Sequence, residues 1–129
     1  MTLPSQDTTS IVTFSSSTSN NNNNKEGTLQ IARRGKQNSI LLVALHRPKV
    51  KNAFNDDLYL DLIALLQQVA VDDTLSAIVL TGTGPYFSSG ADLNQMVDVD
   101  DERGMIDKPP GRFMMELLKF PKVSKTRGK

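Results

Sequence analysis

The chain has 129 residues, which suits one domain of ordinary size and excludes two. Its 15 Lys and Arg against 14 Asp and Glu give a net charge of +1, which argues against a dedicated nucleic-acid-binding domain. With no Cys and one His, the sequence excludes disulfide frameworks, thiolate zinc sites and clusters of several histidines, and we expect no metal site. The longest apolar runs are far too short to cross a bilayer, so we expect no membrane span.

The N-terminal segment, residues 1–26, differs in composition from the rest of the chain. It consists mostly of Ser, Thr, Gln and Asn, and residues 20–24 are all asparagine. Such a segment buries too little apolar surface to offset the entropy of ordering it, so we predict a disordered tail over residues 1–26. The segment has no Arg or Lys before Lys25 and no continuous apolar core, so we expect no targeting signal in this chain.

Order should begin near Gly27 with two strands. Thr28–Ala32 reads as the first strand, and Arg33–Ser39 contains the Gly and Asn of a hairpin turn. Ile40–Leu45 is a continuous apolar run of strand length, which predicts burial on both faces. Pro48 should end this strand, because proline cannot donate a hydrogen bond to a ladder.

A helix is predicted next. Asn55 is a suitable N-cap, and Asp56 and Asp57 in the first turn suit the helix dipole. An apolar stripe with helical spacing follows, formed by Leu58, Leu62, Leu65, Leu66 and Val69. We expect the helix to end near Val71.

The second half of the chain continues the alternation of strands and helices. Ser76–Thr81 reads as a strand, followed by the turn cluster Gly82–Pro85. A second helix is expected to start in Ala91–Val97, an acidic loop to follow it, and a third helical stretch to span Phe113–Phe120. This order predicts a mixed α/β architecture.

The loop between the third strand and the next helix, residues 82–92, is the best candidate for a functional site. A dinucleotide-binding fingerprint starting at Gly82 fails at Phe87, and a P-loop fails because no Lys follows Gly90. A nucleophile elbow fails because the two serines of this loop lack its glycine frame. Spacing alone leaves a Ser–His pair with His46 open, although a single His at a strand end is usually structural.

A different chemistry fits the end of this loop. Gly90 has no side chain, so a substrate can approach the backbone closely. The amide of Ala91 would lie at a helix N-terminus, where free N–H groups stabilise negative charge. Such a turn can hold a carbonyl oxygen that becomes an oxyanion. An ordinary strand-to-helix connection that contains a glycine stays open as the alternative.

Two motifs in this order resemble a known family. Residues 46–54 read His-Arg-Pro-Lys-Val-Lys-Asn-Ala-Phe, and residues 87–93 read Phe-Ser-Ser-Gly-Ala-Asp-Leu. Together with the helix and strand between them, they resemble the crotonase (enoyl-CoA hydratase/isomerase) family. The second motif is similar to that of the peroxisomal Δ3,Δ2-enoyl-CoA isomerases.

The resemblance implies a fold, a ligand and a set of site residues. The fold would be part of a spiral of β-β-α repeats, and the ligand an acyl-CoA thioester, with coenzyme A as part of the substrate and no other cofactor. The backbone N–H of Ala91 would be one of two oxyanion donors. The walls of the CoA site would include Lys49, Lys51, Ala53, Ser89, Gly90, Asp92 and Leu93. Lys49 and Lys51 would face the nucleotide phosphates, although solvated lysines are the commoner outcome in a loop.

The resemblance covers residues 27–123, rather less than half of the family's domain, and residues 124–129 form a divergent basic end. The second oxyanion donor, the catalytic carboxylate and the oligomerising helices of the family lie in parts that this chain does not match. We do not expect Asp92 or Glu116 to replace the carboxylate. Full-length members form trimers or hexamers, whereas we expect this truncated chain not to assemble.

These observations lead to one main hypothesis and two alternatives. The main hypothesis is a fragment of an acyl-CoA-binding enzyme of fatty-acid metabolism, of the enoyl-CoA isomerase type and inactive alone. The first alternative is a fragment of an enoyl-CoA hydratase or acyl-CoA hydrolase. The second is a non-catalytic acyl-CoA-binding partner of full-length subunits. The resemblance implies a peroxisomal or mitochondrial location for the full-length relative.

Overall fold

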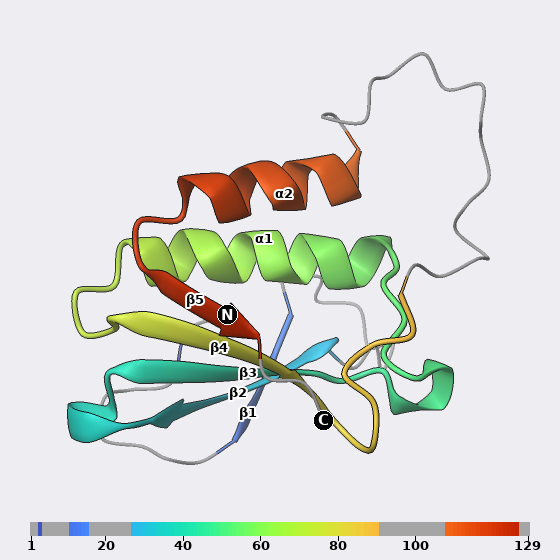
Figure 1. The fold of residues 1–129 in the computed structure, drawn as a ribbon, viewed down its shortest axis with the longest axis horizontal. Helices are drawn as coiled ribbons and strands as arrows, with labels where there is room; N and C mark the ends of the chain where they lie inside the picture. Colours follow the sequence, from blue (N-terminus) through green and yellow to red (C-terminus); the bar gives the residue numbers. More distant parts are fainter. Residues whose placement is uncertain (1–2, 4–10, 16–26, 91–107, 127–129) are drawn as a thin grey trace, which may run out of the picture.

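A computed structural model of the chain describes residues 3, 11–15, 27–90 and 108–126. The predicted mixed α/β architecture is confirmed (Figure 1). The elements in chain order are β1 (Val12–Phe14), β2 (Leu29–Arg34), the 3-10 turn η1 (Lys36–Asn38), β3 (Ile40–Leu45), the 3-10 turn η2 (Pro48–Val50), α1 (Asp56–Ala70), β4 (Ala77–Gly82), α2 (Pro109–Lys119) and β5 (Val123–Thr126).

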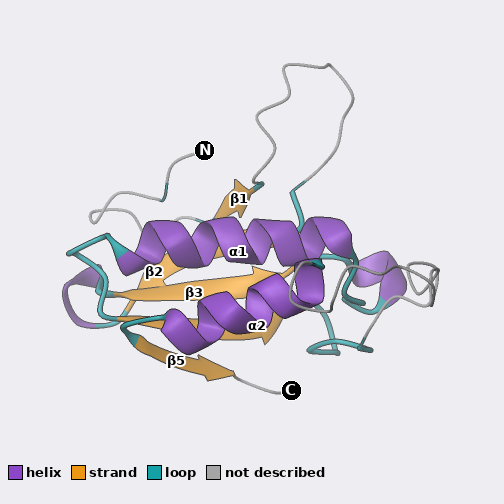
Figure 2. Cartoon of the chain, turned by 90° about the horizontal axis from the view of Figure 1, so that it is seen from above, coloured by secondary structure: helices purple, strands orange, loops and turns teal. Residues whose placement is uncertain are grey.

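The described strands form one sheet in the order β1-β2-β3-β4-β5. The pairs β1–β2 and β2–β3 are antiparallel, whereas the pairs β3–β4 and β4–β5 are parallel. Helix α1 connects β3 to β4, so β2, β3 and α1 make up one β-β-α unit of the expected kind. Both helices lie on the same side of the sheet, with α2 beside α1 and offset toward β5 (Figures 1 and 2).

Helix α1 forms as its sequence predicts. Asn55 is the N-cap, with its side-chain oxygen accepting a hydrogen bond from the Leu58 amide at 2.9 Å, and Val71 is the C-cap. The predicted apolar stripe is buried and packs with the strands. The core consists of Phe14, Leu29, Ile31, Leu41, Val43, Leu45, Leu58, Leu62, Leu65, Leu66, Val69, Leu75, Ile78 and Leu80.

Strand β3 has the predicted bounds, but it is not buried on both faces. Its odd-numbered residues are fully buried, whereas its even-numbered residues stay partly exposed. The reason is that both described helices cover the same face of the sheet. Strands β2 and β4 start one residue later than predicted, and β2 extends to Arg34 because its pairing with β3 continues through the turn-proximal residues.

The N-terminal segment contains one strand that the prediction of a disordered tail over residues 1–26 did not include. Val12–Phe14 pairs antiparallel with β2, and the Phe14 side chain is fully buried in the core. A β-branched residue and an aromatic residue supply enough apolar surface here to hold a short strand against the sheet. The asparagine run lies outside the described residues.

The basic end of the chain begins as a strand, because β5 continues past Val123 to Thr126 and pairs parallel with β4. Lys122 explains part of this placement. Its ammonium donates hydrogen bonds to the main-chain carbonyl oxygens of Val69, at 2.8 Å, and Asp72 at the end of α1. A cation at a helix C-terminus is favourable, so this lysine serves the fold and is not available to bind phosphate.

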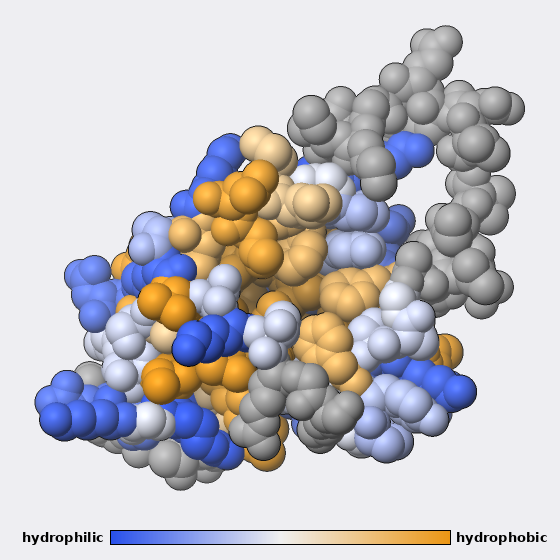
Figure 3. Space-filling model, viewed as in Figure 1, coloured by the Kyte–Doolittle hydropathy of each residue, from blue (hydrophilic) through white to orange (hydrophobic). Residues whose placement is uncertain are grey.

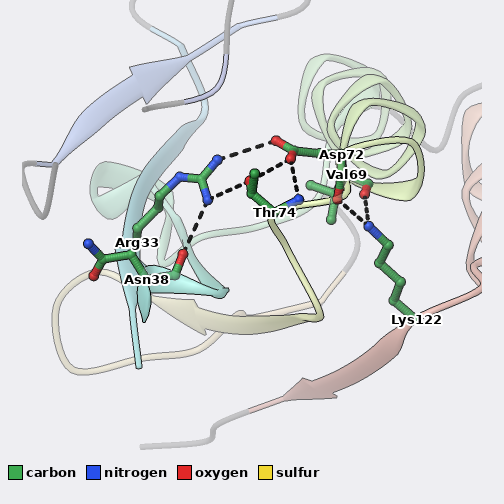
Figure 4. Close-up of polar contacts among 6 residues, drawn as sticks. All are labelled: Arg33, Asn38, Val69, Asp72, Thr74 and Lys122. Carbon is green, nitrogen blue, oxygen red and sulfur yellow. Dashed lines mark hydrogen bonds and ion pairs between the residues drawn. The ribbon is translucent and has the colours of Figure 1, made fainter. Parts of the chain in front are cut away.

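A polar cluster beside this lysine holds a buried arginine (Figure 4). Arg33 of β2 is 3% exposed and forms an ion pair with the carboxylate of Asp72 at 3.3 Å. Its guanidinium also donates to the Thr74 hydroxyl at 3.0 Å and to the Asn38 carbonyl at 3.2 Å. The cluster therefore joins the β2–β3 turn to the α1–β4 connection and allows a charged residue inside the strand.

The same cluster makes stability depend on pH. Partial burial by itself raises the pKa of Asp72, but hydrogen bonds from Thr74 and the charges of Arg33 and Lys122 outweigh it and hold the pKa below its ordinary value of 3.8. The ionised carboxylate thus stabilises the fold above about pH 4, and this contribution is lost as the pH falls through the folded-state pKa. In urea unfolding, Asp72→Asn should be less stable than the wild type at neutral pH. The difference should shrink as the pH falls below about 4, and a constant difference would contradict this account.

The outer side of α2 is apolar. Met114 and Leu118 are 63% and 79% exposed, and Figure 3 shows hydrophobic side chains gathered over this part of the molecule. Neither helix in the described part of the chain is long and apolar enough to span a membrane. An exposed apolar surface of this kind favours contact with another chain.

Candidate active site

Two loops meet at the carboxyl ends of the parallel strands β3 and β4. We call residues 46–54 the β3 loop and residues 83–90 the β4 loop. In open α/β sheets, ligands bind outside the carboxyl ends of parallel strands. The first motif, residues 46–54, is the β3 loop, and residues 87–90 of the second motif lie in the β4 loop. The whole of α1 and β4 separates them in the chain.

Main-chain hydrogen bonds join the loops directly. The Phe54 amide donates to the Gly90 carbonyl at 2.8 Å, and the Ser89 amide donates to the Lys51 carbonyl at 3.0 Å. These two bonds resemble a short piece of β-ladder and fix the end of the β4 loop against the β3 loop. The position of Gly90, the last described residue of the β4 loop, is therefore tied to the β3 loop.

Asn52 makes side-chain bonds to both loops. It is fully buried, its side-chain oxygen accepts from the Arg47 amide at 2.8 Å, and its side-chain nitrogen donates to the carbonyls of Thr83 and Tyr86, both at 2.9 Å. Asn52 belongs to the first motif, residues 46–54, but the prediction gave its side chain no role of its own. Its φ is 56°, a left-handed conformation that asparagine tolerates better than most residues, but an asparagine in a loop does not by itself indicate three partners.

The β3 loop also lines a cavity of about 270 Å³, formed by His46, Arg47, Pro48, Lys49 and Val50. The Arg47 guanidinium donates to the Ala53 carbonyl, which holds it across the loop. Arginine and lysine side chains at a cavity of this size suit an anionic group such as a phosphate.

The structure separates the two lysines that the family resemblance grouped together. Lys49 lines the cavity, whereas the Lys51 ammonium lies over the Tyr86 ring, 5.3 Å from its centroid. Ala53 is buried between its neighbours, and Ser89 and Gly90 are exposed at the end of the β4 loop. The predicted oxyanion donor Ala91 and the predicted wall residues Asp92 and Leu93 lie outside the described residues, as do the predicted helix start and acidic loop that follow them.

The other catalytic alternatives find no support in the geometry. The His46 ring lies 3.4 Å from the Thr83 hydroxyl, whereas the two serine hydroxyls of the β4 loop donate to main-chain carbonyls of the β3 loop. Glu116 accepts a hydrogen bond from Gln67 of α1 at 3.4 Å, which places it on the helical layer. Within the described ranges, no group of three acidic, His or Cys side chains is arranged to hold a metal ion.

An aromatic cluster anchors the end of the β3 loop to the helices. The Phe54 ring lies 5.0 Å from the Tyr59 ring of α1 and 6.5 Å from the Phe113 ring of α2, measured between centroids. Burial raises the pKa of the Tyr59 phenol and the nearby Asp56 carboxylate adds to this, so the phenol stays neutral at physiological pH. The cluster gives the loop a rigid support.

Comparisons with known proteins agree with this geometry. A family model described as enoyl-CoA hydratase/isomerase matches residues 35–126. The chain is 31% identical over 108 residues to the mouse protein enoyl-CoA delta isomerase 3, peroxisomal, covering 76% of this chain and 34% of that protein. It is 42% identical over 64 residues to enoyl-CoA hydratase, mitochondrial, of Pongo abelii, covering 50% of this chain and 22% of that protein.

The fold has a solved counterpart. The crystal structure of an enoyl-CoA hydratase from Shewanella pealeana superimposes with a TM-score of 0.66 and 29% sequence identity, covering 77% of this chain and 38% of the other. In these three comparisons the chain spans between about a fifth and two fifths of the length of its relatives. The matched family range reaches Thr126, the last residue of β5, and so agrees with the strand seen there.

Proposed function

Because the chain belongs to the enoyl-CoA hydratase/isomerase family, we propose that it binds acyl-CoA thioesters at the junction of the β3 and β4 loops. The observation that carries this proposal is the pair of main-chain bonds at Lys51 and Phe54, which place the end of the β4 loop beside a basic cavity. One ligand could then place its phosphates at the cavity and its thioester beyond Gly90. The proposed CoA-site residues are Lys49, Lys51, Ala53, Ser89, Gly90, Asp92 and Leu93.

The proposed reaction of the complete site is the shift of an enoyl-CoA double bond. A carboxylate removes a proton from the α-carbon, the thioester oxygen takes up negative charge as a dienolate, and the proton returns two carbons away. The backbone N–H of Ala91 would donate to that oxygen. The isomerase form of the second motif supports this reaction over hydration, and peroxisomes or mitochondria are the compartments proposed for the longer relative.

This chain alone should bind without measurable turnover. Loss of one oxyanion donor lowers a rate by about 10²–10³-fold, and loss of a general base by about 10²–10⁴-fold. Calorimetric titration with crotonyl-CoA should give saturable binding that weakens with added salt. Absence of saturable binding would overturn the proposal, and turnover comparable to a full-length isomerase would overturn the assignment of an incomplete site.

The two lysines should contribute unequally to this binding. Lys49→Ala should weaken crotonyl-CoA binding about three- to fivefold, because the cavity loses a cation that can reach a phosphate. Lys51→Ala should change the affinity less than about twofold, because its ammonium is already held over Tyr86. Calorimetry on both variants checks this order. Equal effects would show that the cavity is not the phosphate site.

The apolar side of α2 favours a second candidate function, a non-catalytic partner of full-length subunits. Met114 and Leu118 would lie in such an interface. Co-elution with a full-length family member in size-exclusion chromatography would support it. Leu118→Lys should abolish co-elution, and absence of any complex with the wild-type chain would exclude this candidate.

A further inference from the structure

We propose that Asn52 is a positioning residue, which fixes the β4 loop, as far as Gly90, relative to the basic cavity of the β3 loop. The expected effect of Asn52 on acyl-CoA binding rests on the proposed function. Its role in fixing the β4 loop rests on the described contacts alone. The inference assigns a functional role to a residue outside the proposed CoA-contact set.

The side chain of Asn52 satisfies three main-chain groups at once. One belongs to its own loop, the Arg47 amide at 2.8 Å, and two belong to the β4 loop, the carbonyls of Thr83 and Tyr86 at 2.9 Å. All three bonds converge on a fully buried amide. Buried main-chain groups need such partners. A rearrangement of one loop would therefore break hydrogen bonds that the other loop needs.

The backbone at Asn52 continues the connection toward Gly90. Lys51 and Asn52 both have left-handed φ values, 54° and 56°. In this backbone conformation, the Asn52 carbonyl accepts a hydrogen bond from the Ser88 hydroxyl at 2.8 Å. The Ser88 hydroxyl oxygen in turn accepts a hydrogen bond from the Gly90 amide at 3.0 Å. Two successive hydrogen bonds thus connect Asn52 to Gly90, the last described residue of the loop.

The role follows from where these contacts lie. Asn52 is outside the hydrophobic core, and its bonds join two loops and leave the sheet and α1 untouched. Loss of its side chain should therefore release the β4 loop locally while the rest of the fold stays closed. A ligand that spans both loops would then lose the fixed distance between its two binding regions.

The test uses Asn52→Gly, because glycine keeps the left-handed backbone and removes only the side chain. Asn55→Ala is the matched control, since it removes a side-chain bond of another asparagine, the cap bond to Leu58 within the first turn of α1. Hydrogen exchange followed by NMR reports on the Phe54 and Ser89 amides, which donate across the junction. In Asn52→Gly, exchange of these two amides should accelerate relative to the wild type. The acceleration should be at least about tenfold greater than that of the core amides in the same variant.

Each outcome decides something. In Asn55→Ala the same two amides should follow the core amides, and crotonyl-CoA affinity should stay at the wild-type value while Asn52→Gly weakens it at least about tenfold. Unchanged protection of Phe54 and Ser89 in Asn52→Gly would overturn the inference. If the wild type binds no acyl-CoA, the proposed function fails, and the exchange result still decides the positioning role. Asn52→Asp, which keeps the acceptor but loses both donors, serves if the glycine variant does not fold.

Discussion

Phe14→Ala should lower the free energy of unfolding by about 3–5 kcal/mol, as removal of a fully buried aromatic ring does. Phe14 lies in the core beside Leu29, its cross-strand partner. The chain also passes very closely here, because a Cβ on Gly27 would lie 2.3 Å from the Phe14 carbonyl oxygen. Denaturant unfolding followed by circular dichroism measures the loss.

Ile11→Ala is the matched control for this prediction. Ile11 lies in the same segment but is 64% exposed, so its truncation should change stability by less than about 0.5 kcal/mol. If Phe14→Ala proved as mild as Ile11→Ala, Phe14 would not belong to the core, and β1 would not belong to the sheet.

Gly82→Ala should destabilise the fold by about 3 kcal/mol or more. A Cβ on Gly82 would lie 2.3 Å from the Tyr86 carbonyl oxygen and 2.5 Å from that of Phe87. Both obstacles are backbone atoms, so the whole β4 loop would have to move. The movement would also break the bond from Asn52 to the Tyr86 carbonyl, so acyl-CoA binding should fall together with stability.

The turn glycine Gly84 offers the control. Its φ is +76°, but a Cβ there would meet no atom within 4 Å. Gly84→Ala should therefore cost only the strain of a left-handed alanine, about 1–2 kcal/mol. Thermal unfolding of both variants compares them directly. Equal losses would show that backbone conformation, and not the close approach of the β4 loop, explains the effect at Gly82.

Local sequence signals predicted the elements whose cause is local. Helix α1 has its cap, its acidic first turn and its apolar stripe in one continuous stretch, from Asn55 to Ala70, and the sequence predicts all three. Strand β3 has the predicted bounds because its apolar run ends at polar residues followed by proline. Helix α2 starts at Pro109, ahead of the predicted Phe113, because proline is tolerated in the first turn of a helix.

Elements that depend on distant partners escaped prediction. Strand β1 forms because it pairs with β2, and the composition of a Ser/Thr-rich segment does not predict that pairing. Arg33 stays inside a strand because Asp72, which lies beyond the far end of α1, neutralises it. The last strand continues past Val123 despite its charged side chain, because an edge strand tolerates one.

The candidate site was predicted in part. The two motifs were expected to act together, and the structure brings residues 46–54 and 83–90 into direct contact. The different positions of Lys49 and Lys51 could not be predicted, because they depend on which side chain contacts Tyr86 and which lines the cavity. The role of Asn52 was missed because a single asparagine in a loop gives no sign of three simultaneous partners.

One measurement tests the central proposal, that the Ala91 amide donates a hydrogen bond to a thioester carbonyl oxygen. The 15N-labelled chain is titrated separately with butyryl-CoA and with free coenzyme A, and the amide resonances are followed by NMR. We predict that the β3 loop responds to both ligands, whereas the Ala91 amide proton moves downfield only with the thioester. An Ala91 resonance that responds identically to the two ligands, or to neither, would contradict the account.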